Sequence, residues 1–311
     1  MIGRLMSQLP EKSFLVQRYA RLAFPQYSLI GYSMAGEETV VQVPELNVCF
    51  DIGRAPQFCL SSDYLCITHG HMDHVAGIAY YLSQKQFQGM TGGTILLPAE
   101  LAPQIERLLA VWRDIERQQT PYTLVPMQPN QLYEIRRDFG IRALGTHHGI
   151  ASLGYSIISI REKLKPEFVG IPGEELSRLR REGTEIQYRV EVPLITFLGD
   201  TSVGSVFEHP DVVNAETLIT ECTFFDSDHR SRAKSGKHLH VEQLARILPR
   251  LNNKTVVLTH VSRRTGVRRA RHLLRKSVHE ELLSNVIFLM DFDDSQAGGE
   301  VDEHAANPPP Q

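Results

Sequence analysis

The chain has 311 residues, 42% of them hydrophobic and 22% charged, which is enough apolar material for one large core or two modest ones. Its formal net charge of −3 argues against a strongly basic nucleic-acid-binding protein. The charge is unevenly distributed, however. Residues 291–311 contain six acidic residues and no Lys or Arg, and removing these six negative charges takes the net charge from −3 to +3. The rest of the chain is therefore mildly basic.

Targeting and redox signals are weak in this sequence. The first 24 residues mix apolar side chains with charged and polar ones, which include Glu11, Lys12, Gln17, Arg18 and Arg21. This pattern is typical neither of a signal peptide nor of a membrane span, which needs about 18 unbroken apolar residues, so we expect no membrane contact. No C-x-x-C pair occurs among the four cysteines, which are Cys49, Cys59, Cys66 and Cys222. Reduced thiols and a cytoplasmic location follow as predictions.

The first half of the chain alternates short β-branched runs with amphipathic helical stretches. Residues 1–26 are predicted to form an N-terminal helical extension. Apolar periodicity then predicts a hairpin at 39–53, strands at 63–69 and 94–100, helices at 75–87 and 99–115, and strands at 132–136, 141–146 and 153–160.

The second half follows the same plan after a charged segment with Gly and Pro, residues 161–193, which we expect to project as an insertion. The predicted elements are strands at 194–199, 217–222 and 255–259, and helices at 241–250 and 267–283. Residues 293–311 form an acidic, Pro-containing tail that we expect to be disordered. This alternation predicts an α/β fold in which helices cover sheets.

The stretch CITHGHMDHVAG, residues 66–77, concentrates three histidines and an aspartate directly after a predicted strand. In an extended segment alternate side chains share a face, so His69, His71 and Asp73 can point the same way, while a turn into the next helix points His74 elsewhere. His69 and His71 suit one zinc ion, and Asp73 and His74 can reach a second. Two-metal hydrolytic sites have spacings of about 3.5 to 4 Å.

Further candidate ligands each follow a predicted strand: His147 and His148, Asp200, and His260. A single histidine at a strand end is more often a surface residue or a hydrogen-bonded core residue than a metal ligand. The recurrence of such residues at several strand ends nevertheless favours a metal centre.

These motifs resemble those of the metallo-β-lactamase superfamily and, within it, of ribonuclease Z (tRNase Z) in its short plant-type form. The resemblance rests on T-H-G-H-M-D-H, on H-x-x-x-S-x-G-Y from His148 to Tyr155, on G-D-T at Asp200, on E-x-T-F at Glu221–Phe224, on H-x-H at His238 and His240, and on L-T-H-V-S at His260. It implies a catalytic domain over residues 27–292 with an αββα sandwich, in which helices cover two mixed sheets.

The resemblance also implies the roles of individual residues. One zinc would be held by His69, His71 and His148, and the other by Asp73, His74 and His260, with Asp200 bridging. Asp51, Thr201 and His147 would support these ligands from behind. Histidine and carboxylate sites also accept manganese or iron.

The expected chemistry is attack of a metal-activated water on a phosphodiester. Asp73 would orient the water and accept its proton, and His238, held protonated by Glu221, would protonate the leaving oxygen; His240 is the alternative acid. An exposed basic loop at 229–238 and the residues after His260 would contact phosphates through Arg230, Arg232, Lys234, Lys237, Arg263 and Arg264.

Three functional readings remain open at this point. The resemblance implies a zinc-dependent endoribonuclease that cleaves precursor tRNA at its 3′ end and leaves a 3′-hydroxyl, in a family whose members are commonly homodimers. The alternatives are another phosphodiesterase or hydrolase of the superfamily, and a metal-free binding or scaffold subunit. The filled set of ligand positions argues against the last, because such proteins usually lose some of them.

Overall fold

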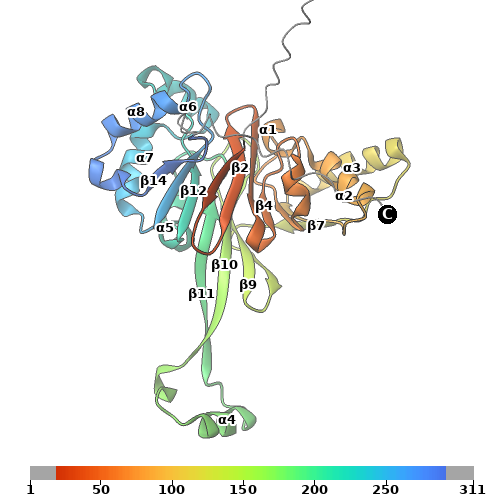
Figure 1. Ribbon diagram of the computed structural model, residues 1–311, viewed down its shortest axis with the longest axis vertical. Coiled ribbons are helices and arrows are strands. Elements are labelled where there is room, and N and C mark those ends of the chain that lie inside the picture. The colour runs from red at the N-terminus through yellow and green to blue at the C-terminus, as the bar shows by residue number, and fades with distance from the viewer. Residues whose placement is uncertain (1–18, 292–311) are drawn as a thin grey trace, which may run out of the picture.

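Two seven-stranded sheets pack face to face with helices on their outer faces in the computed structural model, which describes residues 19–291 (Figure 1). Each sheet comes from one half of the chain, and its strands lie in sequence order. In each sheet the first four strands pair antiparallel and the remaining pairs are parallel. The predicted class, two mixed sheets covered by helices, is confirmed.

The strands and helices have the following bounds. The first sheet contains β1 Ala20–Ala23, β2 Ser28–Met34, β3 Glu38–Val43, β4 Val48–Phe50, β5 Tyr64–Cys66, β6 Thr94–Pro98 and β7 Thr123–Met127. The second contains β8 Leu132–Arg136, β9 Phe139–Gly145, β10 Leu153–Leu164, β11 Gln187–Phe197, β12 Thr217–Glu221, β13 Thr255–Thr259 and β14 Val286–Phe288. The α-helices are α1 Met72–Val75, α2 Ile78–Phe87, α3 Ala102–Glu116, α4 Gly173–Arg181, α5 Pro210–Asn214, α6 Arg230–Gly236, α7 Val241–Ile247 and α8 Val267–Ser277.

The largest apolar cluster fills the space between the sheets. Phe50 of β4 and Phe197 of β11 stack there with ring centroids 5.1 Å apart. Separate clusters join α2 and α3 to the first sheet, and α7 and α8 to the second, so each sheet buries both faces. Burial on both faces explains why the central strands read as continuous apolar runs. In the described part of the chain no helix has the length and apolarity to cross a membrane.

Residues 161–193 project from the body as an arm (Figure 1). The stem of the arm is an extension of β10 and β11, which stay paired from Tyr155 and Phe197 out to Leu164 and Gln187. Helix α4 lies at its tip.

Several local predictions are wrong. Residues 20–23, assigned to the helical extension, form β1, while residues 1–18 and the predicted disordered tail lie outside the described residues. The basic stretch expected to be a loop contains α6, whose Ala233 is buried. The helix predicted at 267–283 ends at Ser277 because Val278 is extended, and a 3₁₀ turn at Glu280–Leu283 follows. The sequence patterns did not predict β1, β2, β7 or β14, nor α4 and α5.

Candidate metal centre

The candidate ligands lie at one edge of the sandwich, in the segments that follow strands. Four of them, His69, His71, Asp73 and His74, lie in the segment that follows β5 and leads into α1. The other three are His148 after β9, Asp200 after β11 and His260 after β13. The carboxyl ends of neighbouring parallel strands meet at one edge of a sheet, which brings residues distant in sequence together. His71 is the N-cap of α1, so Asp73 is helical and does not continue the extended alternation that the sequence suggested.

The first group joins His69, His71, His148 and Asp200, whose candidate ligand atoms all lie within 4.8 Å of one another. Nδ1 of His71 is 3.0 Å from Nε2 of His69 and 3.1 Å from Nε2 of His148. Oδ2 of Asp200 is 3.7 Å from Nε2 of His69. Three imidazoles and one carboxylate thus converge on one point.

The second group joins Asp73, His74 and His260. Oδ2 of Asp73 is 3.4 Å from Nε2 of His260 and 3.7 Å from Nε2 of His74. Nε2 of His74 also lies 3.5 Å from Oδ2 of Asp200. Asp200 is therefore shared between the two groups.

The residues of both groups fit a divalent cation. His74 Nε2 and Asp200 Oδ1 are buried and have no hydrogen-bond partner in the described residues, which is costly unless a cation satisfies them. Burial, the largest cause, lowers the pKa of His69 to about 2, so this imidazole is neutral, the form in which it can bind a metal. Burial raises the pKa of Asp200, but the imidazoles of His260 and His74 outweigh burial and hold this pKa well below its usual range.

Asp51 lies behind the loop and contacts two of its residues. Its buried carboxylate contacts Nδ1 of His74 at 2.8 Å and accepts the backbone N–H of Thr68 at 2.7 Å. This contact turns Nε2 of His74 toward Asp200. The Thr68 hydroxyl, which the sequence reasoning did not single out, lies 2.9 Å from Nδ1 of His69.

The two other expected supports act differently. The backbone N–H of Thr201 donates to Glu221 Oε1 at 2.8 Å, and its hydroxyl accepts the backbone N–H of His147 at 3.0 Å. Only the backbone of His147 takes part in this contact, because its side chain is exposed beside Gly204. Thr201 therefore joins the loops after β9 and β11, whereas the ring of His147 supports no ligand.

His238 lies beside the shared carboxylate, with Nδ1 3.9 Å from Asp200 Oδ2 and 2.9 Å from Glu221 Oε1. Burial lowers the pKa of His238, but the Glu221 carboxylate outweighs burial and raises this pKa to about 9. His240 faces away from this pair. Its two ring nitrogens bind the carbonyl of Asp226 and the backbone N–H of Glu242, because it is the N-cap of α7. These contacts therefore argue against His240 as the alternative acid.

The six predicted phosphate-binding residues divide into two sets. Three have other partners: Arg230 pairs with Glu242, Arg263 pairs with Glu37, and Lys237 donates to the carbonyl of His148 at 3.0 Å. The other three, Arg232, Lys234 and Arg264, are exposed and form no ion pair with a described residue.

Comparison with known proteins agrees with this geometry. The family described as the β-lactamase superfamily domain matches residues 55–261. The chain belongs to this superfamily, and within it to the tRNase Z (ribonuclease Z) family. It is 34% identical over 253 residues to the chloroplastic tRNase Z TRZ2 of Arabidopsis thaliana, covering 80% of this chain and 72% of the relative.

Two further comparisons concern the family and the fold, respectively. The tRNase Z TRZ1 of Arabidopsis thaliana is also 34% identical, over 245 residues, which cover 78% of this chain and 88% of the relative. The crystal structure of YhfI from Bacillus subtilis, a metallo-β-lactamase fold protein, superposes with a TM-score of 0.56 at 19% identity, covering 82% of this chain and 92% of YhfI. The family and the fold inferred from the sequence motifs are thereby confirmed.

Proposed function

We propose that the chain is a zinc-dependent endoribonuclease that cleaves precursor tRNA at its 3′ end and leaves a 3′-hydroxyl on the tRNA. The observation that carries this proposal is the pair of His238 and Glu221 beside the two His/Asp groups. It supplies a proton donor next to a metal site, which is what the departure of a ribose oxygen requires. The relatives named tRNase Z support the choice of substrate.

Two zinc ions are part of the proposal. The ligands would be His69, His71 and His148 for one ion, Asp73, His74 and His260 for the other, and Asp200 for both. Bound zinc lowers the pKa of water toward neutrality, which supplies the nucleophile. The same donor set accepts manganese or iron, so metal analysis of the purified protein decides the identity.

The protein side chains would handle the protons. Oδ2 of Asp73 accepts the backbone N–H of Gly36 at 2.8 Å, which fixes the carboxylate so that it can orient the attacking water and take its proton. His238 would donate a proton to the leaving 3′-oxygen, because Glu221 keeps its imidazole charged. The two proton-transfer groups thus act at opposite ends of the reacting phosphodiester.

A cavity of about 450 Å³ beside His238 gives room for the substrate. Its lining includes Ser202, Val203, Lys234 and Gln243. We propose that Arg232, Lys234 and Arg264, which form no ion pair within residues 19–291, contact phosphates around this cavity. Binding of a precursor should then weaken as salt is raised.

The competing function is a phosphodiesterase or other hydrolase of the same superfamily. Precursor tRNA with a short 3′ trailer, and a small diester such as a cyclic nucleotide, are therefore compared as substrates of the same enzyme preparation. We expect turnover of the precursor and little turnover of the small diester. His238→Ala should slow cleavage by about 10² to 10⁴, the usual effect of losing a general acid, and His272→Ala on α8 is the matched control. Fast turnover of the cyclic nucleotide alone would favour the competing function.

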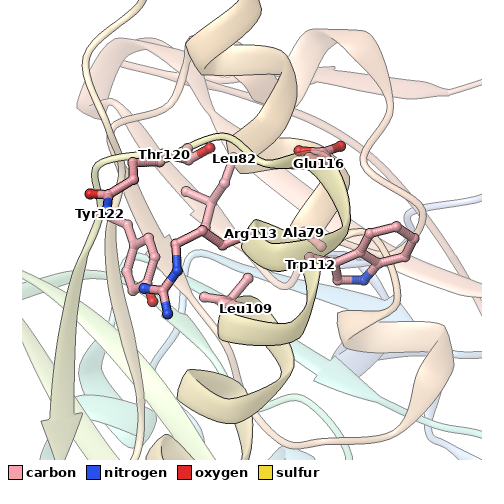
Figure 2. Close-up of a pocket in the computed structure, with 9 residues that line it drawn as sticks. Ala79, Leu82, Leu109, Trp112, Arg113, Glu116, Thr120 and Tyr122 are labelled. Atoms are coloured by element: carbon pink, nitrogen blue, oxygen red, sulfur yellow. The ribbon is translucent and has the colours of Figure 1, made fainter.

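A homodimer is the assembly that we propose. Leu108, Val111, Trp112 and Ile115 form a stripe on α3 and are 42–63% exposed, although the opposite face of α3 is already buried against the first sheet. Figure 2 shows Trp112 at the edge of a small pocket between α2 and α3, close to Ala79. A twofold contact would bury the same stripe on both copies.

Sedimentation of two variants tests the homodimer. Ile115→Glu should give a monomer, because a charge at this contact would lose its water, whereas Asp114→Asn next to it should leave the dimer intact. A wild-type protein that sediments as a monomer would contradict the dimer without affecting the proposed reaction.

We also propose a cytoplasmic location, which the four buried, unpaired cysteines support. One relative is named chloroplastic, so fractionation of the source cells is the test. Recovery of the protein in an organelle fraction would contradict the proposal.

A further inference from the structure

Two threonine hydroxyls occupy equivalent places in the two halves of the molecule. Thr68 follows β5 in the first half, and Thr223 follows β12 in the second. Both are buried, with 1% and 2% of their surface exposed. Each hydroxyl lies between a buried carboxylate and the Nδ1 atom of one candidate ligand histidine.

The second-half contacts fix the direction of the hydrogen bonds. Glu221 Oε1 accepts the backbone N–H of Thr201, and Oε2 accepts that of Leu239 at 3.1 Å, so both oxygens act as acceptors. The hydroxyl of Thr223, 2.5 Å from Oε2, must therefore donate its single hydrogen to Glu221. Its remaining lone pair faces Nδ1 of His260 at 3.0 Å, so this nitrogen carries the hydrogen.

The first-half contacts repeat the arrangement. Asp51 Oδ1 accepts the backbone N–H of Thr68, and the Thr68 hydroxyl lies 2.9 Å from Oδ2 and 3.0 Å from Oδ1. The same hydroxyl is 2.9 Å from Nδ1 of His69. His69 therefore also carries its hydrogen on Nδ1.

The consequence lies at the other nitrogen of each ring. With the hydrogen on Nδ1, Nε2 keeps a free lone pair. Nε2 of His260 faces Asp73 at 3.4 Å, and Nε2 of His69 faces Asp200 at 3.7 Å. Asp200 Oδ1 is also 3.4 Å from Nδ1 of His260, but it forms no hydrogen bond there.

We infer that Thr68 and Thr223 are paired positioning residues, each of which fixes one ligand histidine in the tautomer that can bind a metal. Each buried carboxylate then acts on two histidines, one directly and one through a threonine. Asp51 contacts His74 directly, and Glu221 contacts His238 directly. In the second half the same carboxylate serves both the metal centre and the acid. The inference rests on the proposed metal-dependent function.

Valine substitution tests this inference, because valine keeps the shape of threonine and removes the hydroxyl. Thr68→Val should lower the affinity for one metal ion, and Thr223→Val should lower the affinity for the other. Chelator competition should show a loss of about 10- to 100-fold in each case, the usual cost of losing a residue that orients a ligand. Thr68→Ser and Thr223→Ser keep the hydroxyl and should restore the affinity. Thr220→Val is the matched control, because Thr220 is buried on β12 and its hydroxyl donates to the backbone carbonyl of Glu221, not to the carboxylate or to a ligand histidine.

Three outcomes are distinct. Unchanged metal affinity in both valine variants would overturn the inference and leave the proposed function standing. A wild-type protein that takes up no metal would overturn the proposed function itself. If the valine variants do not fold, nitrogen-15 spectra of the histidine rings in the metal-loaded wild type decide. We expect hydrogen on Nδ1 of His69 and His260, and hydrogen on Nε2 of both would overturn the inference.

Discussion

Replacing Glu221 by Gln should change the pH dependence of cleavage more than its maximum rate. Burial alone would lower the pKa of His238, and the Glu221 carboxylate 2.9 Å away raises it to about 9. Without that charge the pKa should fall to about 6.5 or below. An acid histidine works only while protonated, so activity is present below its pKa and is lost as pH rises through it. The variant should therefore lose activity at lower pH than the wild type.

The expected size of the effect follows from the two pKa values. At pH 8 the protonated fraction of His238 would fall from roughly 90% to roughly 3%, which is about a 30-fold loss of rate. At pH 6 the same substitution would cost less than about twofold through this route. The ratio of the two losses is the diagnostic quantity.

Single-turnover cleavage of precursor tRNA between pH 6 and pH 9 measures this ratio, with Glu216→Gln on the surface as the matched control. The amide also leaves the backbone N–H of Thr201 or Leu239 without an acceptor, which costs about 1–3 kcal/mol of stability. Thermal unfolding at one pH measures that cost separately. Equal losses of rate at pH 6 and pH 8 would refute the role given to Glu221.

The remaining predictions concern the residues that hold the site in place. Asp51→Asn presents an amide N–H to the ring of His74 or to the N–H of Thr68, so metal affinity should fall by about 10- to 100-fold in calorimetry; unchanged affinity would contradict this role. Gly199→Ala should lower stability in urea by about 1 kcal/mol or more, because Gly199 has φ 60° and an added Cβ would lie 2.8 Å from the Thr68 side chain; equal stability would argue against this steric limit. Lys85→Met removes the donor to the Leu60 carbonyl and the ion pair with Asp63, so it should lower the melting temperature while metal content stays unchanged; loss of metal would contradict a purely structural Lys85.

The sequence predicted which residues gather at this edge because most of the information about them is local. Four candidate ligands lie within six residues, and the other three follow strands whose carboxyl ends converge at one edge. Residue type at a strand end was therefore enough to suggest His148, Asp200 and His260.

The choice between His238 and His240 needed the tertiary structure. The H-x-H pattern predicts that the two rings share a face of an extended segment. His240 is instead the N-cap of α7, and both of its ring nitrogens form hydrogen bonds with the backbone. The threonine contacts likewise join residues that are distant in sequence. Thr68 lies 17 residues from Asp51, and Thr223 lies 37 residues from His260, so no local spacing reveals these contacts.

The missed elements have physical explanations of the same kind. β7 contains Pro126, which lowers its strand propensity, but it is the last strand of its sheet, where a missing N–H is tolerated. Helix α6 has no apolar periodicity in its sequence. It is held by burial of Ala233 and by Lys237, whose left-handed backbone ends the helix.

Mapping the ends of the reaction products tests the central claim most directly. Metal-loaded protein and protein treated with a chelator are given the same precursor tRNA, and both fragments are sequenced and their termini identified. We predict one cut, a 3′-hydroxyl on the tRNA, a 5′-phosphate on the trailer, and recovery of cleavage when zinc is returned to the chelated protein. A 3′-phosphate on the tRNA, or cleavage that persists without metal, would contradict both the metal-activated water and the acid role of His238.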